Sequence, residues 1–301
     1  MALRARDMVY LPAGRFTMGS DRHYAEEAPS REVSVDALWI DRYQVTNRQF
    51  AEFVASTGHL TAAERPADPA LYPGADPAML APASVVFRSP ARRVNLNDHL
   101  QWWSYLPGAT WRHPYGRQSS LEGLEDHPVV HVAYSDAIAY AAWAGGQLPT
   151  EAQWEYAAAG GSTAEFAWGD ELTPDGRHMA NLWQGEFPLV NLLLDGYERT
   201  APVGSFPANG FGLYDMIGNV WEWTATGYDT APAASACCGG AAPRPRMQRK
   251  VMKGGSFLCA PNYCRRYRPS ARMPQDIDTS TCHLGFRLVR PASSTGQEPS
   301  E

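Results

Sequence analysis

Two cysteines in the segment 253–272, KGGSFLCAPNYCRRYRPSAR, are the residues best suited to carry out chemistry. Cys259 and Cys264 are separated by four residues. The cationic side chains beside them are Arg265, Arg266, Arg268 and Arg272. A thiol becomes a nucleophile or a metal ligand only as the thiolate, and nearby cations lower its pKa. The segment therefore indicates a reactive pair, and the alternatives are a structural disulfide or two unrelated small apolar residues.

The spacing of this pair leaves four chemistries to compare. A structural zinc site needs four ligands, and the sequence offers no second pair at suitable spacing. A thioredoxin-like site would have two intervening residues within a βαβ pattern, which is absent. A papain-like Cys/His site stays open, although nothing local places a histidine. The fourth is a two-thiolate site for a soft ion, and copper(I) is the soft ion that thiolates select.

Composition and charge exclude several functional classes. The chain has 301 residues, and its 26 Gly and 24 Pro are spread along it, which favours short elements and long ordered loops. A net charge of -6 argues against a nucleic-acid binder. No apolar run approaches the roughly 20 residues of a membrane helix, and the first residues lack the apolar core of a secretory signal. We therefore expect a soluble protein that binds neither nucleic acid nor a membrane.

Cysteine usage indicates a reducing compartment. Five cysteines are too few for a disulfide scaffold, and their odd number leaves at least one unpaired within the chain. We expect a cytoplasmic, monomeric protein. Cys237 and Cys238 fall in the turn-rich segment 231–249 and Cys282 in a final strand, and all three are expected to be peripheral to the chemistry.

Strand patterns occur in three places that bear on the fold. The segments 8–20 and 33–43 alternate apolar and polar residues and predict one strand each. The segment 127–132, HPVVHV, predicts a third, with structural roles for His127 and His131. The segment from 62 to about 90 is rich in Ala and Pro and is expected to be irregular. The aromatic cluster that follows, around Trp102 and Trp111, is expected to anchor its loop.

Helix signals are local and clear. Thr46 and Gln49 form a capping box for a helix that stops at Gly58, and Thr150 with Gln153 form a second one. For that second helix, the residues expected to face the core are Ala152, Tyr156 and Ala159. Between these helices, Ser135 is expected to cap a helix that runs through Trp143. With no internal repeat or domain boundary, the sequence predicts one domain over 1–290 and a disordered tail over 291–301.

Two loop segments carry oxygen donors. The segments 181–195 and 207–223 are dense in Asn, Asp, Glu and Gly among aromatic residues. Calcium takes carboxylate, amide and backbone carbonyl oxygens from loops of this composition. The same residue types also build turns that hold no ion, so the residues alone leave both interpretations open.

A series of motifs extends this reading over nearly the whole chain. The motifs include LPAGRFTMGS, VTNRQFAEFV, HPVVHVAYSDAIAYAAWAGG, LPTEAQWEYAAAGG, NGFGLYDMIGNVWEW, KGGSFLCAPNYCRRYRPSAR and HLGFR. In this order the chain resembles the formylglycine-generating enzymes, also called sulfatase-modifying factors, from about residue 8 to 289. The Cys-x4-Cys spacing is the part specific to the catalytic branch of the wider family.

The resemblance implies a fold and a reaction. The fold is a single α/β (α+β) domain with little regular secondary structure, related to C-type lectins. The reaction oxidises the cysteine of a C-x-P-x-R segment in an unfolded sulfatase polypeptide to Cα-formylglycine, with molecular oxygen and a thiol reductant. The other family members that such a chain could resemble are a non-catalytic, lectin-like binding protein and an iron-dependent sulfoxide synthase of the ergothioneine type.

The resemblance also implies site residues. Cys259 and Cys264 match the copper(I)-binding pair, and Ser256 and Trp221 match positions that line the active site. One calcium site is implied at Asn181, Leu182, Asp195 and Tyr197. A second is implied at Asp215, Gly218, Val220 and Glu222. The chain departs from the family pattern at 192–194, where three leucines replace a more polar run.

Overall fold

The computed structural model describes residues 8–228 and 248–292. It contains three α-helices and several short strands joined by long loops. The helices are α1 (Asn47–Thr57), α2 (Tyr134–Ala144) and α3 (Glu151–Ala159). The expected mixed α/β fold with little regular secondary structure is confirmed.

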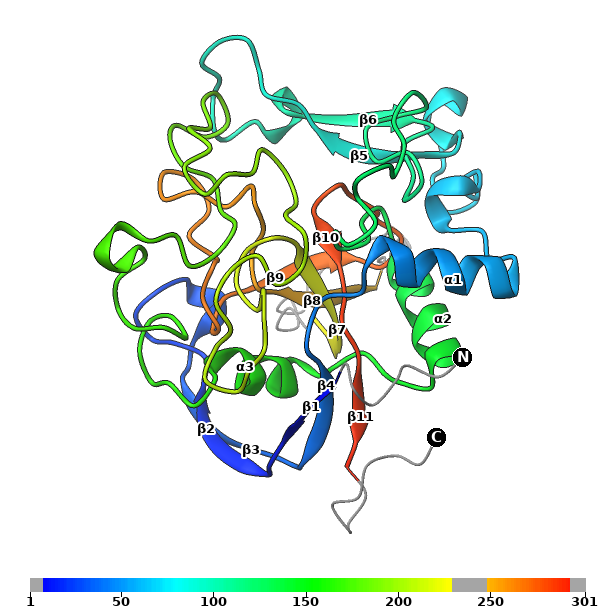
Figure 1. Ribbon diagram of the computed structural model, residues 1–301. Coiled ribbons are helices and arrows are strands. Elements are labelled where there is room, and N and C mark those ends of the chain that lie inside the picture. The colour runs from blue at the N-terminus through cyan, green and yellow to red at the C-terminus, as the bar shows by residue number, and fades with distance from the viewer. Residues whose placement is uncertain (1–7, 229–247, 293–301) are drawn as a thin grey trace, which may run out of the picture.

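Four small sheets organise the chain (Figure 1). The strands that form a sheet of order β10-β7-β8-β9 are β7 (Trp221–Gly227), β8 (Arg249–Lys253), β9 (Arg272–Asp276) and β10 (Leu284–Gly285). The strands that form a sheet of order β1-β4-β11 are β1 (Met8–Leu11), β4 (Leu38–Asp41) and β11 (Val289–Pro291). Two hairpins pair β2 (Gly14–Met18) with β3 (Arg31–Val35), and β5 (Ala83–Phe87) with β6 (Trp103–Pro107). Both cysteines of the predicted site lie in the loop between β8 and β9.

The capping boxes predicted from sequence are confirmed. Thr46 accepts from the Gln49 backbone N–H while the Gln49 side chain accepts from the Thr46 N–H, and Gly58 ends α1 with φ 68°. Thr150 and Gln153 do the same for α3. Each partner lies three residues away in the chain, which is why the sequence alone shows the pair.

Several predicted elements are wrong in detail. Each of the two long strands is divided, into β1 and β2 and into β3 and β4. The helix cap predicted at Ser135 lies instead at Ala133, whose N–H donates to the Asp136 carboxylate at 2.9 Å. The irregular segment that starts at residue 62 contains β5 at its end.

The core-facing side of α3 also differs from the prediction. Tyr156 is buried and Ala152 packs, partly buried, against the same core, as predicted, whereas Ala159 stays partly exposed. The other apolar side chains that the helix buries are Trp154, Ala157 and Ala158. Both the outer and the inner side of this short helix carry small residues. Spacing alone therefore identified only part of the buried face.

The segment 127–132 is not a strand. His131 has φ 61°, a left-handed conformation that interrupts any ladder. Its buried ring hydrogen-bonds Ser84 Oγ at 2.7 Å and the Pro114 carbonyl at 2.8 Å. Burial lowers the pKa of His131 to about 4, so the ring is neutral. The structural role predicted for this histidine is confirmed.

The aromatic loop is anchored as expected. Trp102 and Trp111 are almost fully buried. Trp102 packs in a cluster with Phe187, Phe257 and Ala260, so it lies under the loop that carries the cysteines. Cys282 is also buried, as expected, whereas Cys237 and Cys238 lie outside the described residues.

Candidate active site

Two glycines form the entrance to the cysteine loop. Gly254 and Gly255 follow β8 with φ values of 96° and 75°, which favour glycine. A Cβ at Gly254 would lie 3.0 Å from the Trp154 ring, and one at Gly255 would lie 3.0 Å from the Arg266 carbonyl. The glycines therefore let the outgoing and returning arms of the loop approach closely, which closes it into a compact unit.

The cysteines meet inside this loop. The Cys259 N–H donates to the Ser256 carbonyl at 2.8 Å and the Cys264 N–H to the Ala260 carbonyl at 3.0 Å. These turns bring the two Sγ atoms to 3.3 Å, well beyond the roughly 2.05 Å of a disulfide bond. Both thiols are free and buried. The arrangement is therefore a buried dithiol.

The two thiols differ in acidity. The hydrogen bond from Cys259 lowers the pKa of Cys264 to about 7, with further support from Arg266. Burial raises the pKa of Cys259, and hydrogen bonds from Ser256 partly oppose this. Above about pH 7 the pair therefore holds one proton between two sulfurs, with Cys259 as the donor and Cys264 as the acceptor.

Ser256 and Trp221 lie where the sequence placed them. Ser256 is fully buried and hydrogen-bonds Cys259. Trp221 begins β7, and its backbone N–H donates to the His283 carbonyl at 2.8 Å. Its side chain belongs to the same apolar cluster as both cysteines. The structure thus brings all four residues of the predicted active site into one region.

Three of the four nearby arginines are held by specific glutamates in buried or half-buried pairs. Arg266 pairs with Glu26 at 2.5 Å, Arg268 with Glu27 at 2.6 Å and Arg272 with Glu151 at 2.7 Å. Arg265 is the more exposed one, 3.8 Å from Glu165. These arginines mainly tie the loop to the segment 25–27 and to α3, and Arg266 is the one that also favours the Cys264 thiolate.

The first set of predicted calcium ligands converges. The Asp195 carboxylate accepts from the N–H groups of Leu182 at 3.1 Å and Tyr197 at 3.0 Å. Asn181 donates its Nδ2 to the Arg199 carbonyl, and its buried Oδ1 has no partner within the described ranges. An orphaned buried oxygen of this kind is suited to a hard cation, and the adjacent Leu182 lies within hydrogen-bond distance of the Asp195 carboxylate. The Gln184 Nε2 group donates hydrogen bonds to both the Leu182 carbonyl and Asp195 Oδ2.

The second set is already satisfied by protein groups. The Glu222 oxygens accept from Gln44, from the Trp154 indole and twice from Arg287, at 2.7 to 3.0 Å. A carboxylate has about four acceptor positions, so none is left for an ion. Gln44 Nε2 also lies 3.2 Å from the carbonyls of Asp215 and Val220. In this arrangement the second set does not fit a bound calcium.

Sequence reasoning missed the residues that organise these loops. Asn219 links the two sets, because its Oδ1 accepts from Ala201 and Asn181 while its Nδ2 donates to Gln44. Arg287 neutralises Glu222 from a distant segment. Both lie in quoted motifs, NVWEW and HLGFR, but nothing in those motifs shows which residue each one contacts.

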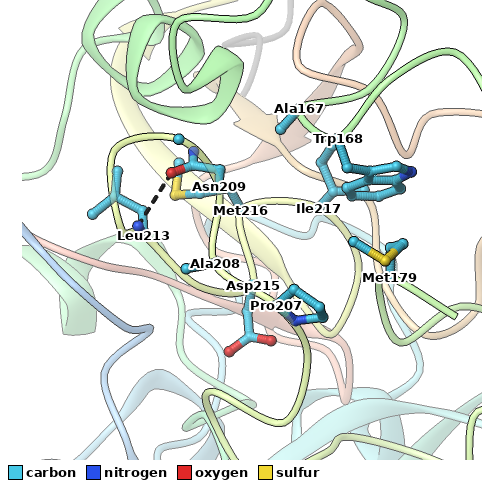
Figure 2. A pocket seen from close by; sticks show the side chains of 11 residues that line it. Ala167, Trp168, Met179, Pro207, Ala208, Asn209, Leu213, Asp215, Met216 and Ile217 are labelled. Carbon is cyan, nitrogen blue, oxygen red and sulfur yellow. Dashed lines mark hydrogen bonds between the residues drawn. The ribbon is translucent and has the colours of Figure 1, made fainter. Parts of the chain in front are cut away.

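Two cavities lie close to residues of the candidate site: Asp215 lines one and Phe166 lines the other. The smaller, of about 70 Å³, is lined by Trp168, Met179, Met216 and Asp215 (Figure 2), and burial raises the pKa of Asp215 to about 6. The larger, of about 770 Å³, reaches Phe166, whose ring stacks on Tyr267 near the cysteines. No group of three or more His, Cys, Asp or Glu side chains is placed to bind a metal within 8–228 and 248–292. In the same ranges, no helix is long and apolar enough to span a membrane.

The structure shows a protein of mixed α/β fold with a buried dithiol at its candidate active site. Comparison with known proteins shows the family to which it belongs. Residues 2–292 match the family model of the sulfatase-modifying factor enzyme 1-like domain, and the chain belongs to this family.

Relatives and solved structures agree with this assignment. The formylglycine-generating enzyme of Mycobacterium tuberculosis is 56% identical, over 94% of this chain and 97% of its own. The inactive Cα-formylglycine-generating enzyme 2 of Mus musculus is 38% identical, over 96% and 86%. The structure of PvdO from Pseudomonas aeruginosa has 26% identity and a TM-score of 0.61, over 94% of each chain.

Proposed function

We propose that this protein is a formylglycine-generating enzyme that oxidises the cysteine of a C-x-P-x-R segment in an unfolded sulfatase polypeptide. The observation that carries the proposal is the buried pair of free thiols, 3.3 Å apart, in a chain of this family. An inactive relative shares much of the sequence, so the fold alone does not support catalysis. The buried dithiol is therefore the feature on which the proposed catalysis rests.

The donor set fits copper(I), a soft ion that thiolates select. Cys259 and Cys264 would hold it, and a bound copper(I) supplies one-electron chemistry with oxygen. Because Cys259 keeps its proton when Cys264 has lost its own, loading the ion releases at least one proton. The Ser256 hydrogen bond supports the Cys259 thiolate thus formed, and burial excludes water.

The overall reaction consumes two electrons from outside the substrate. The cysteine CH2–SH and one O2, with two electrons and two protons, become the aldehyde, hydrogen sulfide and water. The C–S bond and one C–H bond of the substrate carbon break, one C=O bond forms, and the second oxygen atom leaves as water. Two molecules of a small thiol, oxidised to a disulfide, balance the electrons. We also propose that the protein is monomeric and that it acts in the cytoplasm, because small thiols are abundant in the cytoplasm.

Calcium is proposed as a structural ion at the first set of ligands. The Asn181 side-chain oxygen and the Asp195 carboxylate would bind it, with the carbonyls of Leu182 and Tyr197. The support is the orphaned Asn181 oxygen, whose desolvation nothing else offsets within the described ranges. The second set is left out because the acceptor positions of Glu222 are filled.

A peptide assay tests the function. The protein is incubated with copper(I), oxygen, a thiol reductant and a short C-x-P-x-R peptide, and conversion of thiol to aldehyde is followed by mass spectrometry. We expect turnover by the wild type and none by Cys264→Ser, because one thiolate cannot hold the ion between two sulfurs. Cys282→Ser is the matched control, since Cys282 is buried outside the dithiol, and should retain turnover.

Each outcome of the assay is decisive. Absence of conversion by wild-type protein shown to contain copper would refute the proposed activity. An active Cys264→Ser variant would refute the role of the pair. Copper content per chain, measured on the same samples, separates a failure to bind the ion from a failure of the chemistry.

A further inference from the structure

Four aliphatic side chains project from one short loop. Val190, Leu192, Leu193 and Leu194, which we call the leucine patch, are exposed by 44, 57, 44 and 63%. Eleven large hydrophobic side chains are exposed in the described part of the chain, and four of them fall within these five residues. Single exposed hydrophobics are ordinary, but a contiguous group marks an interaction surface.

The backbone holds the patch in a defined conformation. The Leu193 N–H donates to Asn191 Oδ1 at 3.2 Å, the Leu192 N–H to the Gln184 carbonyl at 2.6 Å, and the Gly196 N–H to the Leu193 carbonyl at 3.0 Å. Leu193 has φ 54°, a conformation that is unfavourable for leucine. The loop therefore keeps leucine where Asn or Gly would be more stable, which points to a use for the side chain.

The segment that leads into the patch contacts the cysteine loop. The Phe187 ring stacks on Tyr263 with centroids 4.7 Å apart, and Phe187 exchanges two hydrogen bonds with the Asn262 side chain. Asn262 and Tyr263 lie between the two cysteines, and Tyr263 is 39% exposed. In Figure 1 the yellow-green segment that carries the patch lies beside the orange segment that carries the cysteines.

We propose that the leucine patch binds apolar side chains of the unfolded client polypeptide that flank its reacting cysteine. The inference rests on the proposed function, because an unfolded client exposes the apolar side chains that a folded protein buries. An extended chain advances by about 3.3 Å per residue, so residues a few positions from the reacting cysteine can reach a neighbouring loop. The patch would then favour long unfolded clients over short peptides.

Binding is measured first, without any reaction. The ligand is a fluorescent, reduced and unfolded polypeptide of about 40 residues whose reacting cysteine is replaced by serine and whose flanks contain leucine and valine. Fluorescence anisotropy gives its Kd. We expect Leu192→Ser combined with Leu194→Ser to weaken binding roughly tenfold, which corresponds to losing partial burial of two leucines. Leu60→Ser is the matched control, since Leu60 is 59% exposed at the end of the α1 region.

The variant Leu193→Asn distinguishes an effect on client binding from an effect on the stability of the fold. Asparagine tolerates φ 54° better than leucine, so this variant should melt no earlier than the wild type. It should nevertheless bind the client several-fold more weakly, because it loses one apolar contact. In turnover assays, the patch variants should raise KM for the long client with kcat unchanged, while kcat/KM for the short C-x-P-x-R peptide stays the same.

The outcomes distinguish this proposal from the proposed function. Wild-type affinity in the patch variants, or equal weakening by Leu60→Ser, would overturn docking at the patch. A wild-type protein that converts neither peptide would refute the activity, while anisotropy would still report on the patch. If sedimentation shows a wild-type dimer that the leucine variants convert to monomer, a second copy covers the patch and the proposal fails.

Discussion

The cysteine loop and the polar network around Asn219 are built in opposite ways. The cysteine loop is closed by contacts within one short segment, such as the backbone hydrogen bonds from Cys259 to Ser256 and from Cys264 to Ala260. Backbone hydrogen bonds also link it to distant segments, from Phe257 to the Asn219 carbonyl and from Trp183 to the Cys259 carbonyl. The network joins Gln44, Asn181, Asn219 and Arg287 to Glu222, and its single contacts span as many as 178 residues of the chain. The cysteine loop carries the chemistry, and the network around Asn219 positions loops that are distant from one another in the chain.

One strand connects the two regions. Trp221 and Glu222 are adjacent in β7, and side chains of adjacent strand residues point to opposite faces. Trp221 belongs to the apolar cluster that also contains both cysteines, whereas Glu222 binds Arg287. Damage to the network should therefore be transmitted to Trp221, although no residue of the network touches the thiols. Three experiments sharpen this contrast.

The largest expected effect follows from Arg287→Met. This change leaves the fully buried Glu222 carboxylate without its cation, which costs about 3 to 5 kcal/mol of unfolding free energy. Thermal unfolding should shift down by roughly 10 °C or more. Arg48→Met is the matched control, because the Arg48–Asp126 pair is exposed and such pairs contribute about 0 to 1 kcal/mol. Equal melting of the two variants would contradict a structural role for the network.

This contrast also explains what the sequence could predict. The cysteine pair and the capping boxes at Thr46 and Thr150 could be predicted because each partner lies within a few residues in the chain. The mixed fold and the site residues Ser256 and Trp221 came from the resemblance to a family. The structure then brought these residues to the cysteines.

Contacts between distant segments could not be predicted. The segment 127–132 looks like a strand, but the Val129 N–H donates to the Val45 carbonyl and the His131 N–H to the Thr281 carbonyl. Two different segments thus take its backbone hydrogen bonds, and no ladder forms. In the same way, the arginines near the cysteines looked like a cationic environment, whereas Glu26 and Glu27, some 240 residues earlier in the chain, neutralise two of them.

Adding calcium should have an intermediate effect on the free energy of unfolding, and this effect distinguishes the two sets of oxygen ligands. At about 100 times its Kd, the ion should stabilise the wild type by about 2.7 kcal/mol. Asp195→Asn should abolish this shift, whereas Asp215→Asn should retain it, because the Glu222 site is already filled. Thermal unfolding with and without calcium, together with the number of ions per chain, tests this. Two bound ions would show that Gln44 moves aside to open the second site.

The smallest effect concerns the proton shared by the thiols. Because the pKa of Cys264 is lowered from 9.0 to about 7, its thiolate stabilises the folded state fully above pH 9 and loses that contribution as pH falls through 7. Cys259 acts in the opposite direction: its raised pKa disfavours the folded state once an unfolded thiol would ionise, above about pH 9.

Thiolate absorbance of the metal-free, reduced protein measures this directly. The difference between wild type and Cys264→Ser should show one ionisation with a midpoint near pH 7. A midpoint at the value of an ordinary thiol would mean that Cys259 does not donate to Cys264. Arg287→Met, studied below its melting temperature, should leave this midpoint unchanged, because the hydrogen bonds that lower the pKa all lie within the cysteine loop. A shifted midpoint in that variant would show that the local site depends on the long-range network.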